Sequence, residues 1–277
     1  MLRTMRGMTH RWLMDESAHP AAADHGHGLE PIVRRFLDAR GISDPAAIDE
    51  YIRPRLTSMH DPSTLPGLER ASQRLLEALD RGERTVIYGD YDVDGVCATA
   101  ILFRILRALR PDADVRTYVP HRVDEGYGLN EQAIRELARD GASVIVSVDC
   151  GITARGPARA ARESGVDLII TDHHNPDASE PLPDAHTIVH PRLPGSEYPC
   201  GELCGAGVAF KLAWRLATMR QGGDRVGEAL QTMLLDLLAL AGLATVADIV
   251  PLTGENRVIA KWGLARVKST DITGLRA

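Results

Sequence analysis

Acidic and histidine side chains directly follow three short apolar segments of the chain. They are Asp90, Asp92 and Asp94 after residues 85–88, Asp149 after residues 143–148, and Asp172, His173 and His174 after residues 166–171. Carboxylates crowded together repel one another unless divalent cations neutralise them. Mixed carboxylate and imidazole ligands suit Mn²⁺, with Mg²⁺ as the alternative, and two such ions can activate a water for attack at phosphorus. The pattern therefore predicts a metal-dependent phosphoester hydrolase.

The elements that must position these side chains alternate between strands and helices. Strands are predicted at 85–88, 115–119, 143–148, 167–171 and 187–189, and helices at 97–109, 131–139, 157–164, 208–220, 226–243 and 256–266. This alternation predicts an α/β fold with a parallel β-sheet flanked by helices and a helical C-terminal portion. In such a sheet, ligand sites collect beyond the carboxyl ends of the strands, where the three acidic motifs stand.

The chain is predicted to contain three regions. Residues 1–28 are polar and rich in Ala and His around Pro20, which indicates a flexible tail. Residues 29–82 carry helical apolar patterns interrupted by prolines and form a helical N-terminal segment. Residues 83–277 form the catalytic domain.

Composition narrows the class of protein. The 277 residues are 44% hydrophobic and 25% charged, which is ordinary for a globular protein. A net charge of −6 leaves no basic footprint for nucleic acid over the whole chain, although a local basic surface stays open. Four scattered cysteines fit a reducing cytoplasm. No apolar signal segment is evident, and the apolar stretch 234–250 contains two acids, so we expect a cytoplasmic protein without a membrane span.

Each motif has a structural alternative when it is taken alone. Asp90, Asp92 and Asp94 in extended backbone would share one side and a cation, but three such residues also suit a solvated turn. Asp149 can cap a helix instead of binding a metal. Asp248, between Ala247 and Ile249, is either a further metal ligand or a residue in the last turn of a helix. Three acidic motifs, each at the end of a predicted strand, together favour the metal site over these alternatives.

Two glycine-containing segments are candidates for holding substrate. In residues 122–130, Arg122 can bind phosphate and Tyr127 can stack on a base, although a Gly-rich surface turn explains the segment equally well. In residues 204–208, the N–H groups of Gly205 and Gly207 can bind an anion at the start of a helix. Close helix packing is the alternative explanation for these two glycines.

Taken together, four motifs resemble those of the DHH phosphoesterase superfamily. They are residues 88–95 (YGDYDVDG), 148–152 (VDCGI), 172–174 (DHH) and 247–251 (ADIVP). Residues 125–129 (EGYGL) and 205–212 (GAGVAFKL) resemble the RecJ branch, whose members are single-strand-specific 5′→3′ DNA exonucleases of repair and recombination. The resemblance runs from about residue 29 to the end of the chain.

The resemblance implies a role for each matching residue. It implies that Asp92, Asp94, Asp149, His173 and Asp248 bind metal, that Asp90 acts beside them, and that His174 contacts the scissile phosphate. Two Mn²⁺ or Mg²⁺ ions are implied, although Tyr88 stands where some relatives place a histidine ligand.

The resemblance also implies partners and a longer protein. Single-stranded DNA is the implied substrate, and a helicase and a single-strand-binding protein are implied partners. RecJ proteins continue into a DHH-associated domain, so we expect this chain to be truncated before it. The alternatives are a phosphodiesterase for short oligonucleotides or cyclic dinucleotides, and a non-catalytic nucleic-acid-binding fragment.

Overall fold

The computed structural model describes residues 2–6, 11–15, 28–123, 125–223 and 225–277 of the chain. Its main feature is a five-stranded parallel sheet in the order β4-β3-β5-β6-β7. The strands are β3 (Thr85–Tyr88), β4 (Val115–Tyr118), β5 (Val144–Val148), β6 (Asp167–Thr171) and β7 (Thr187–Val189). Each agrees with a predicted strand to within one residue at either end, and the predicted α/β class is confirmed.

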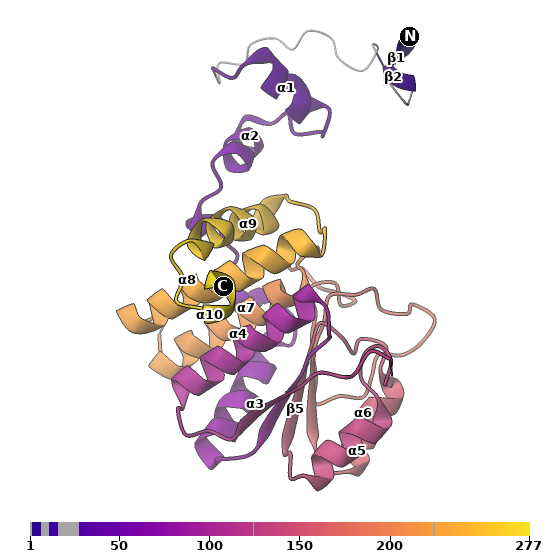
Figure 1. Cartoon of the computed structure of the whole chain (residues 1–277), viewed down its shortest axis with the longest axis vertical. Helices are drawn as coiled ribbons and strands as arrows, with labels where there is room; N and C mark the ends of the chain where they lie inside the picture. Colours follow the sequence, from indigo (N-terminus) through magenta and orange to yellow (C-terminus); the bar gives the residue numbers. More distant parts are fainter. Residues whose placement is uncertain (1, 7–10, 16–27, 124, 224) are drawn as a thin grey trace. The chain divides into compact units, whose positions relative to one another are not determined.

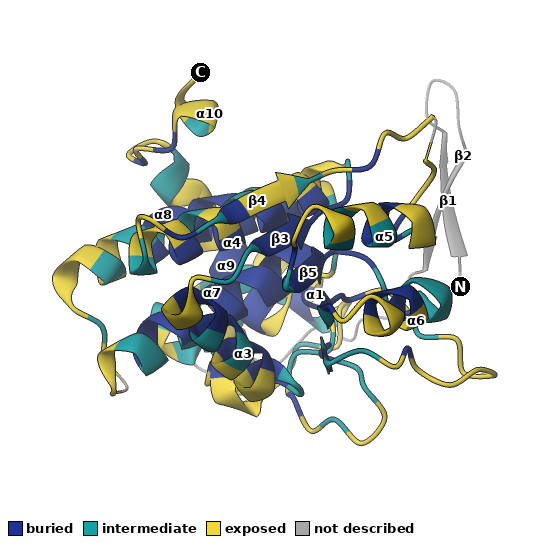
Figure 2. Ribbon diagram, turned by 90° about the horizontal axis from the view of Figure 1, so that it is seen from below, coloured by how far each residue is buried: buried dark blue, intermediate teal, exposed yellow. Residues whose placement is uncertain are grey.

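Helices cover both faces of the sheet (Figure 1). One face carries α3 (Leu68–Arg81), α4 (Val93–Leu109) and α7 (Gly205–Gln221), and the other carries α5 (Glu131–Arg139) and α6 (Arg155–Glu163). Val144, Val146 and Val148 of β5 pack into the first core, whereas Ile145 between them packs into the second. Successive strand residues face opposite sides, so a strand covered on both faces must be apolar throughout. Figure 2 shows the resulting burial of β3 and β5, in contrast to the partly exposed edge strand β4.

The C-terminal part of the chain is helical, as predicted. After α7 come α8 (Glu228–Ala247), α9 (Gly254–Val267) and α10 (Thr273–Arg276). α8 is the one helix of the described residues long and apolar enough to cross a membrane, with a mean hydropathy of 1.7 over its most apolar 18 residues. However, 56% of that window is buried, and α8 packs against α4, α7 and α9. These contacts are those of a core helix.

The chain divides into two compact units, Met1–Arg55 and Leu56–Ala277. The first contains an antiparallel pair, β1 (Leu2–Arg6) and β2 (Arg11–Asp15), followed by α1 (Pro31–Asp38) and α2 (Pro45–Ile52). The sequence patterns predicted no strands there, and the flexibility of residues 1–28 stays a prediction because residues 7–10 and 16–27 lie outside the described ones. The second unit begins with two short 3₁₀ helices, η1 (Leu56–Ser58) and η2 (Pro62–Thr64). The domain boundary predicted at residue 83 falls inside this unit, since α3 packs on α7 and β7.

The start of α4 differs from the prediction and matters for the site. The helix begins at Val93 rather than at residue 97, because the Asp92 carboxylate accepts a hydrogen bond from the Gly95 N–H at 2.9 Å and caps it. Asp94 therefore lies in the first helical turn. The extended backbone predicted for residues 90–94 is wrong beyond Asp92.

A buried ion pair ties the C-terminal helices to the loops around them. Lys211 of α7 and Glu255 of α9 are both fully buried and pair directly. The Lys211 ammonium also donates to the His60 carbonyl at 2.5 Å, and the Tyr198 hydroxyl donates to Glu255 at 2.6 Å. Burial lowers the pKa of Lys211, although the Glu255 charge opposes this effect. Both charges are thus compensated inside the core.

Candidate metal centre

The carboxyl ends of four neighbouring strands bring four polar residues into one row. The register pairs Val148 with Thr171 and Thr171 with Val189, so the residues that follow them are Asp149, Asp172 and His190. Backbone hydrogen bonds continue the ladder, from Asp149 N–H to Thr171 and from Asp172 N–H to Val189. Because Tyr88 of β3 pairs with Ser147, Asp90 stands level with Asp149. The parallel ladder thus gathers residues from 90 to 190 at one edge.

The His173 ring lies among three carboxylates that come from distant parts of the sequence. Its Nε2 is 3.1 Å from Asp149 Oδ1, 3.7 Å from Asp94 Oδ2 and 3.7 Å from Asp248 Oδ2. Asp94 comes from the first turn of α4, Asp149 from the end of β5, and Asp248 from the C-terminus of α8. Asp248 is thus both the helix-end residue and the ligand candidate that the sequence allowed.

Three groups of side chains within the described residues can each hold a metal ion. They are Asp90, Asp92 and Asp149; Asp149, His173 and His174; and Asp94, His173 and Asp248. In each group the ligand atoms lie within 4.8 Å of one another. Asp149 belongs to two groups, and so does His173. Because a carboxylate has two oxygens, Asp149 could contribute a ligand to each of two neighbouring ions.

Several of these atoms are buried without a hydrogen-bond partner. Asp90 Oδ1, Asp149 Oδ1 and His173 Nε2 have none, although the last two lie only 3.1 Å apart. An unsatisfied buried polar atom costs about 1–3 kcal/mol, and more when it is charged. Oxygen and imidazole atoms left without partners inside these groups fit a divalent cation such as Mn²⁺ or Mg²⁺.

The raised pKa values of carboxylates in the site also indicate that a positive charge is needed to stabilise their ionised forms. Burial, together with the charges of Asp94 and Asp92, raises the pKa of Asp149 to about 10. Burial also raises the pKa values of Asp90, Asp94 and Asp248. Without a cation these carboxylates resist ionisation, and a divalent ion reverses that preference.

The N-terminus of α7 holds one of the acids in place. The N–H groups of Gly205 and Ala206 donate to the two Asp94 oxygens at 2.6 and 2.7 Å. The N–H of Gly207 is directed to Cys204 Sγ at 3.4 Å. The predicted role of Gly205 and Gly207 in binding substrate finds no support here, because these N–H groups already have acceptors. Instead, the helix N-terminus stabilises a carboxylate of the metal centre.

Gly205 also leaves the room that Asp149 occupies. A Cβ added at Gly205 would stand 2.5 Å from Asp149 Oδ1, whereas one at Gly207 would meet no atom closer than 3.4 Å.

We therefore expect Gly205→Ala to lower the affinity for Mn²⁺ about tenfold or more, since it displaces a ligand. The matched change Gly207→Ala lies in the same helix turn and should leave that affinity unaltered. Calorimetric titration of Mn²⁺ into both variants measures this difference. Equal, parent-like affinities in the two would contradict the packing of Gly205 against Asp149.

The His174 ring is oriented by Asp172 and Tyr127, which belong to none of the three metal-holding groups. Its Nδ1 lies 2.8 Å from Asp172 Oδ1, and its Nε2 lies 3.3 Å from the Tyr127 hydroxyl. Asp172 is buried and accepts N–H groups of Ile152, His173 and His174. The hydrogen bond with Asp172 raises the pKa of His174, although burial opposes it. The His174 side chain is about half exposed, so it is accessible from solvent beside the buried ligands.

Further aromatic and basic groups extend outward from His174. The Tyr127 ring contacts the ring of Tyr91 edge-on at 6.3 Å, and the Arg122 guanidinium lies over Tyr91 at 4.9 Å. The predicted substrate residues Arg122 and Tyr127 thus stand beside the metal centre, joined by Tyr91. Tyr88 is fully buried and its hydroxyl donates to the Gly128 carbonyl at 3.1 Å, so it supports the loop that carries Tyr127.

The structure therefore brings together the seven predicted ligand and catalytic residues, with Arg122 and Tyr127 next to them. Their roles stay predictions. The sequence placed Asp172 among the clustered acids but did not predict that it orients His174. Tyr91, His190 and Arg192 had no predicted role, although His190 directly follows a predicted strand. That position was the available signal.

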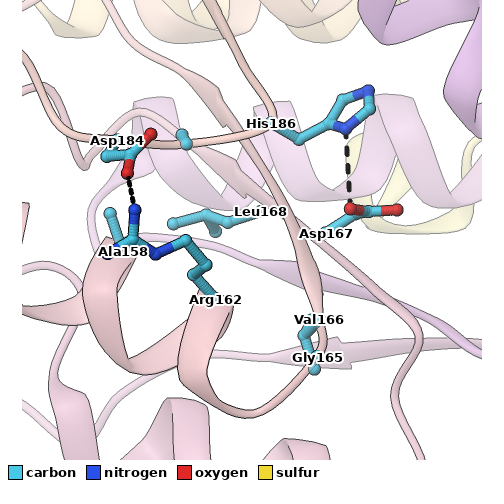
Figure 3. Close-up of a pocket in the computed structure, with 9 residues that line it drawn as sticks. Ala158, Arg162, Gly165, Val166, Asp167, Leu168, Asp184 and His186 are labelled. Atoms are coloured by element: carbon cyan, nitrogen blue, oxygen red, sulfur yellow. Dashed lines mark hydrogen bonds and ion pairs between the residues drawn. The ribbon is translucent and has the colours of Figure 1, made fainter.

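A separate pocket lies at the opposite end of β6. It has a volume of about 290 Å³ and is lined by residues from α6, β6 and the segment before β7, including Arg162, Asp167, Asp184 and His186 (Figure 3). Its charged groups pair among themselves, Arg162 with Asp184 and His186 with Asp167. None of the metal-centre residues lines it.

Comparisons with known proteins agree with this architecture. Residues 84–242 match the model of the DHH family, N-terminal domain. The single-stranded-DNA-specific exonuclease RecJ of Bacillus subtilis is 42% identical over 248 residues, which are 90% of this chain and 29% of that protein. The Escherichia coli exonuclease of the same name is 34% identical over 89% of this chain and 42% of its own length.

Solved structures of RecJ proteins are also similar to this chain. A structure of exonuclease RecJ bound to manganese superimposes with a TM-score of 0.67 at 40% identity, covering 80% of this chain and 52% of that one. RecJ from Thermus thermophilus in complex with Mn²⁺ superimposes with a TM-score of 0.67 at 35% identity, covering 87% of this chain and 32% of that one.

The fold and the donor set define an α/β protein with a centre suited to divalent cations. The chain belongs to the DHH family. It spans between about 29% and 42% of the length of the curated RecJ proteins that it matches.

Proposed function

We propose that this chain carries the catalytic metal centre of a 5′→3′ exonuclease that hydrolyses phosphodiester bonds of single-stranded DNA. The observation that carries the proposal is the position of Asp149, which two of the three donor groups share. Two Mn²⁺ or Mg²⁺ ions held by these residues would supply an activated water and offset charge at the reacting phosphate. Relatives that cover most of this chain are named single-stranded-DNA-specific exonucleases, and one is solved with manganese.

Different residues of the chain would bind the metal ions and the phosphate. Asp90, Asp92 and Asp149 would hold one ion. Asp149 with His173, whose Nε2 also lies near Asp94 and Asp248, would hold the other. Because its hydrogen bond with Asp172 favours the protonated ring, His174 would place a positive charge beside the anionic phosphate. Tyr127 fixes the His174 ring, and Arg122 supplies a second positive charge farther out. A positive group in contact with the neighbouring rings of Tyr91 and Tyr127 suits a single strand, whose phosphates and bases are both accessible.

The proposal extends to cellular context. Degradation of single strands serves repair and recombination, and a cytoplasmic location fits such a substrate in bacteria like those of the relatives. A helicase that generates single strands and a single-strand-binding protein are the partners that this activity would use.

Hydrolysis of 5′-labelled single-stranded DNA in Mn²⁺, beside a duplex of the same sequence and a dinucleotide, tests the proposal. The expected result is release of labelled mononucleotide from the long single strand alone. Faster cleavage of the dinucleotide would instead assign a phosphodiesterase of short substrates. Binding of the strand without cleavage, in a protein shown to hold Mn²⁺, would assign a non-catalytic fragment.

Arg122 should act mainly on substrate binding. We expect Arg122→Ala to raise KM for single-stranded DNA about tenfold while kcat changes little, since a lost phosphate contact is worth about 1.5–3 kcal/mol at most. Initial rates over a range of strand concentrations measure both constants. Arg116→Ala, at an exposed arginine of β4 paired with Asp114, serves as the control for loss of one positive charge. An unchanged KM in Arg122→Ala would remove Arg122 from the substrate site.

A further inference from the structure

The residues after β7 contact the backbone of the histidine pair. His190 is fully buried, and its Nε2 lies 2.7 Å from the His174 carbonyl oxygen. Its Nδ1 lies 2.9 Å from the Arg192 N–H, which donates to it. Since Nδ1 accepts this bond, the ring proton is on Nε2 and is donated to the His174 carbonyl. Both ring nitrogens are occupied, and His190 belongs to none of the three metal-holding groups.

The Arg192 side chain holds the neighbouring peptide. Its Nη2 donates to the His173 carbonyl oxygen, and its Nη1 lies 3.3 Å from Glu202 Oε1. Two consecutive carbonyls, those of His173 and His174, are therefore bonded by side chains only two residues apart. The backbone N–H of Arg192 connects the two side chains by bonding His190. We call His190 and Arg192 the carbonyl clamp.

The carbonyl clamp bears on where the imidazole rings of His173 and His174 point. A peptide carbonyl fixes its peptide plane, and the planes at residues 173 and 174 determine where the two side chains point. His173 must reach the space among Asp94, Asp149 and Asp248, while His174 must reach Asp172 and Tyr127. A reacting geometry displaced by about 1 Å can cost on the order of 100-fold in rate.

We propose that His190 and Arg192 are positioning residues, which hold the backbone of His173 and His174 so that one ring binds metal and the other faces the phosphate. The effect on hydrolysis rests on the proposed function. The effect on metal affinity does not, because His173 belongs to the metal centre whatever the substrate is.

The experiment compares His190→Ala, His190→Gln and His186→Ala. Glutamine keeps an N–H donor near the position of Nε2, whereas alanine removes it. His186 precedes β7 at the opposite end of the sheet, where it pairs with Asp167 and lines the pocket of Figure 3, so it controls for loss of a histidine beside the same strand. Calorimetric titration with Mn²⁺ gives affinity, and rates at saturating Mn²⁺ give kcat and KM. Urea unfolding of the metal-free proteins gives stability.

We expect His190→Ala to lower Mn²⁺ affinity about tenfold and to lower kcat more than it raises KM, as changes to groups that orient ligands do. His190→Gln should recover most of both losses, and His186→Ala should match the parent protein. If His190→Ala does not fold, Arg192→Met tests the other half of the clamp with the same expected loss. Folded variants with parent-like Mn²⁺ affinity and kcat would overturn the proposal, even if their unfolding free energy were lower. If His190→Ala lowers Mn²⁺ affinity but the parent protein itself cleaves no DNA, the carbonyl clamp is supported and the proposed function is refuted.

Discussion

Asp149→Asn is expected to remove almost all Mn²⁺-dependent hydrolysis while leaving the metal-free protein folded. Asparagine has nearly the shape of the protonated carboxyl group and, like aspartate, tolerates the left-handed backbone found here, where φ is 62°. Alanine would add backbone strain, so asparagine is the cleaner substitution. Loss of the shared ligand should reduce kcat on the order of 10³-fold, equivalent to about 4 kcal/mol of transition-state stabilisation.

The same variant should alter stability in a direction that depends on metal. Burial first, and then Asp94 and Asp92, raise the pKa of Asp149 to about 10, so the metal-free folded protein must take up a proton on this group at pH 7. A carboxyl group whose pKa is raised on folding lowers stability as pH rises above its unfolded value near 4. Asparagine avoids that cost, and metal-free Asp149→Asn should therefore unfold at the same or a higher temperature than the parent.

Mn²⁺ should reverse the order of stability, so that the parent protein unfolds at a higher temperature than Asp149→Asn. At a Mn²⁺ concentration about 100 times Kd, the parent gains about 2.7 kcal/mol, and the variant should gain far less. Thermal unfolding with EDTA and with Mn²⁺ measures both effects, and Asp112→Asn at an exposed position is the matched control. A variant that is still stimulated and stabilised by Mn²⁺ like the parent would sink the assignment of Asp149 as a shared ligand.

Lys211→Met is expected to lower the free energy of unfolding by about 3–5 kcal/mol, because it leaves the fully buried Glu255 without its counter-charge. The side chains have similar length, so the loss comes from charge more than from packing. Lys211 also joins the His60 loop to α7, and Glu255 binds the Tyr198 hydroxyl from the loop that follows β7. Urea unfolding at neutral pH measures the change.

A second substitution separates charge from packing. In Lys211→Met combined with Glu255→Gln, no unpaired charge remains and the amide can still bond His60 and Tyr198, so the double variant should be more stable than Lys211→Met alone. Arg81→Met, which breaks an exposed pair with Glu77, should change stability by no more than about 0.5 kcal/mol. Were Lys211→Met as stable as the parent, the buried pair would contribute nothing to the fold.

Local patterns in the sequence were sufficient for the five strands of the parallel sheet, though not for β1 and β2, and for most of the candidate site. A parallel strand covered on both faces must be apolar throughout, and the chain must turn where it leaves the sheet, so the runs before Asp90, Asp149 and Asp172 indicate both a strand and its end. The rule that sites collect at the carboxyl edge then predicts that these acids meet. The start of α4 also has a local signal, because Asp92 is a favourable N-cap residue, but the extended backbone predicted for the acidic motif placed the helix start too late.

Tertiary structure alone decided which groups complete the centre. Asp94 binds the N–H groups of Gly205 and Ala206, 111 and 112 residues away, and no local pattern distinguishes that arrangement from a helix start open to substrate. His190 enters the row of Asp149 and Asp172 through the pairing of β6 with β7. The sequence by itself determined the fold class and which acids and histidines gather at the strand ends, since apolar periodicity is a property of neighbouring residues. Register and helix packing determined which atoms face one another, because those contacts depend on segments that meet only after the chain has folded.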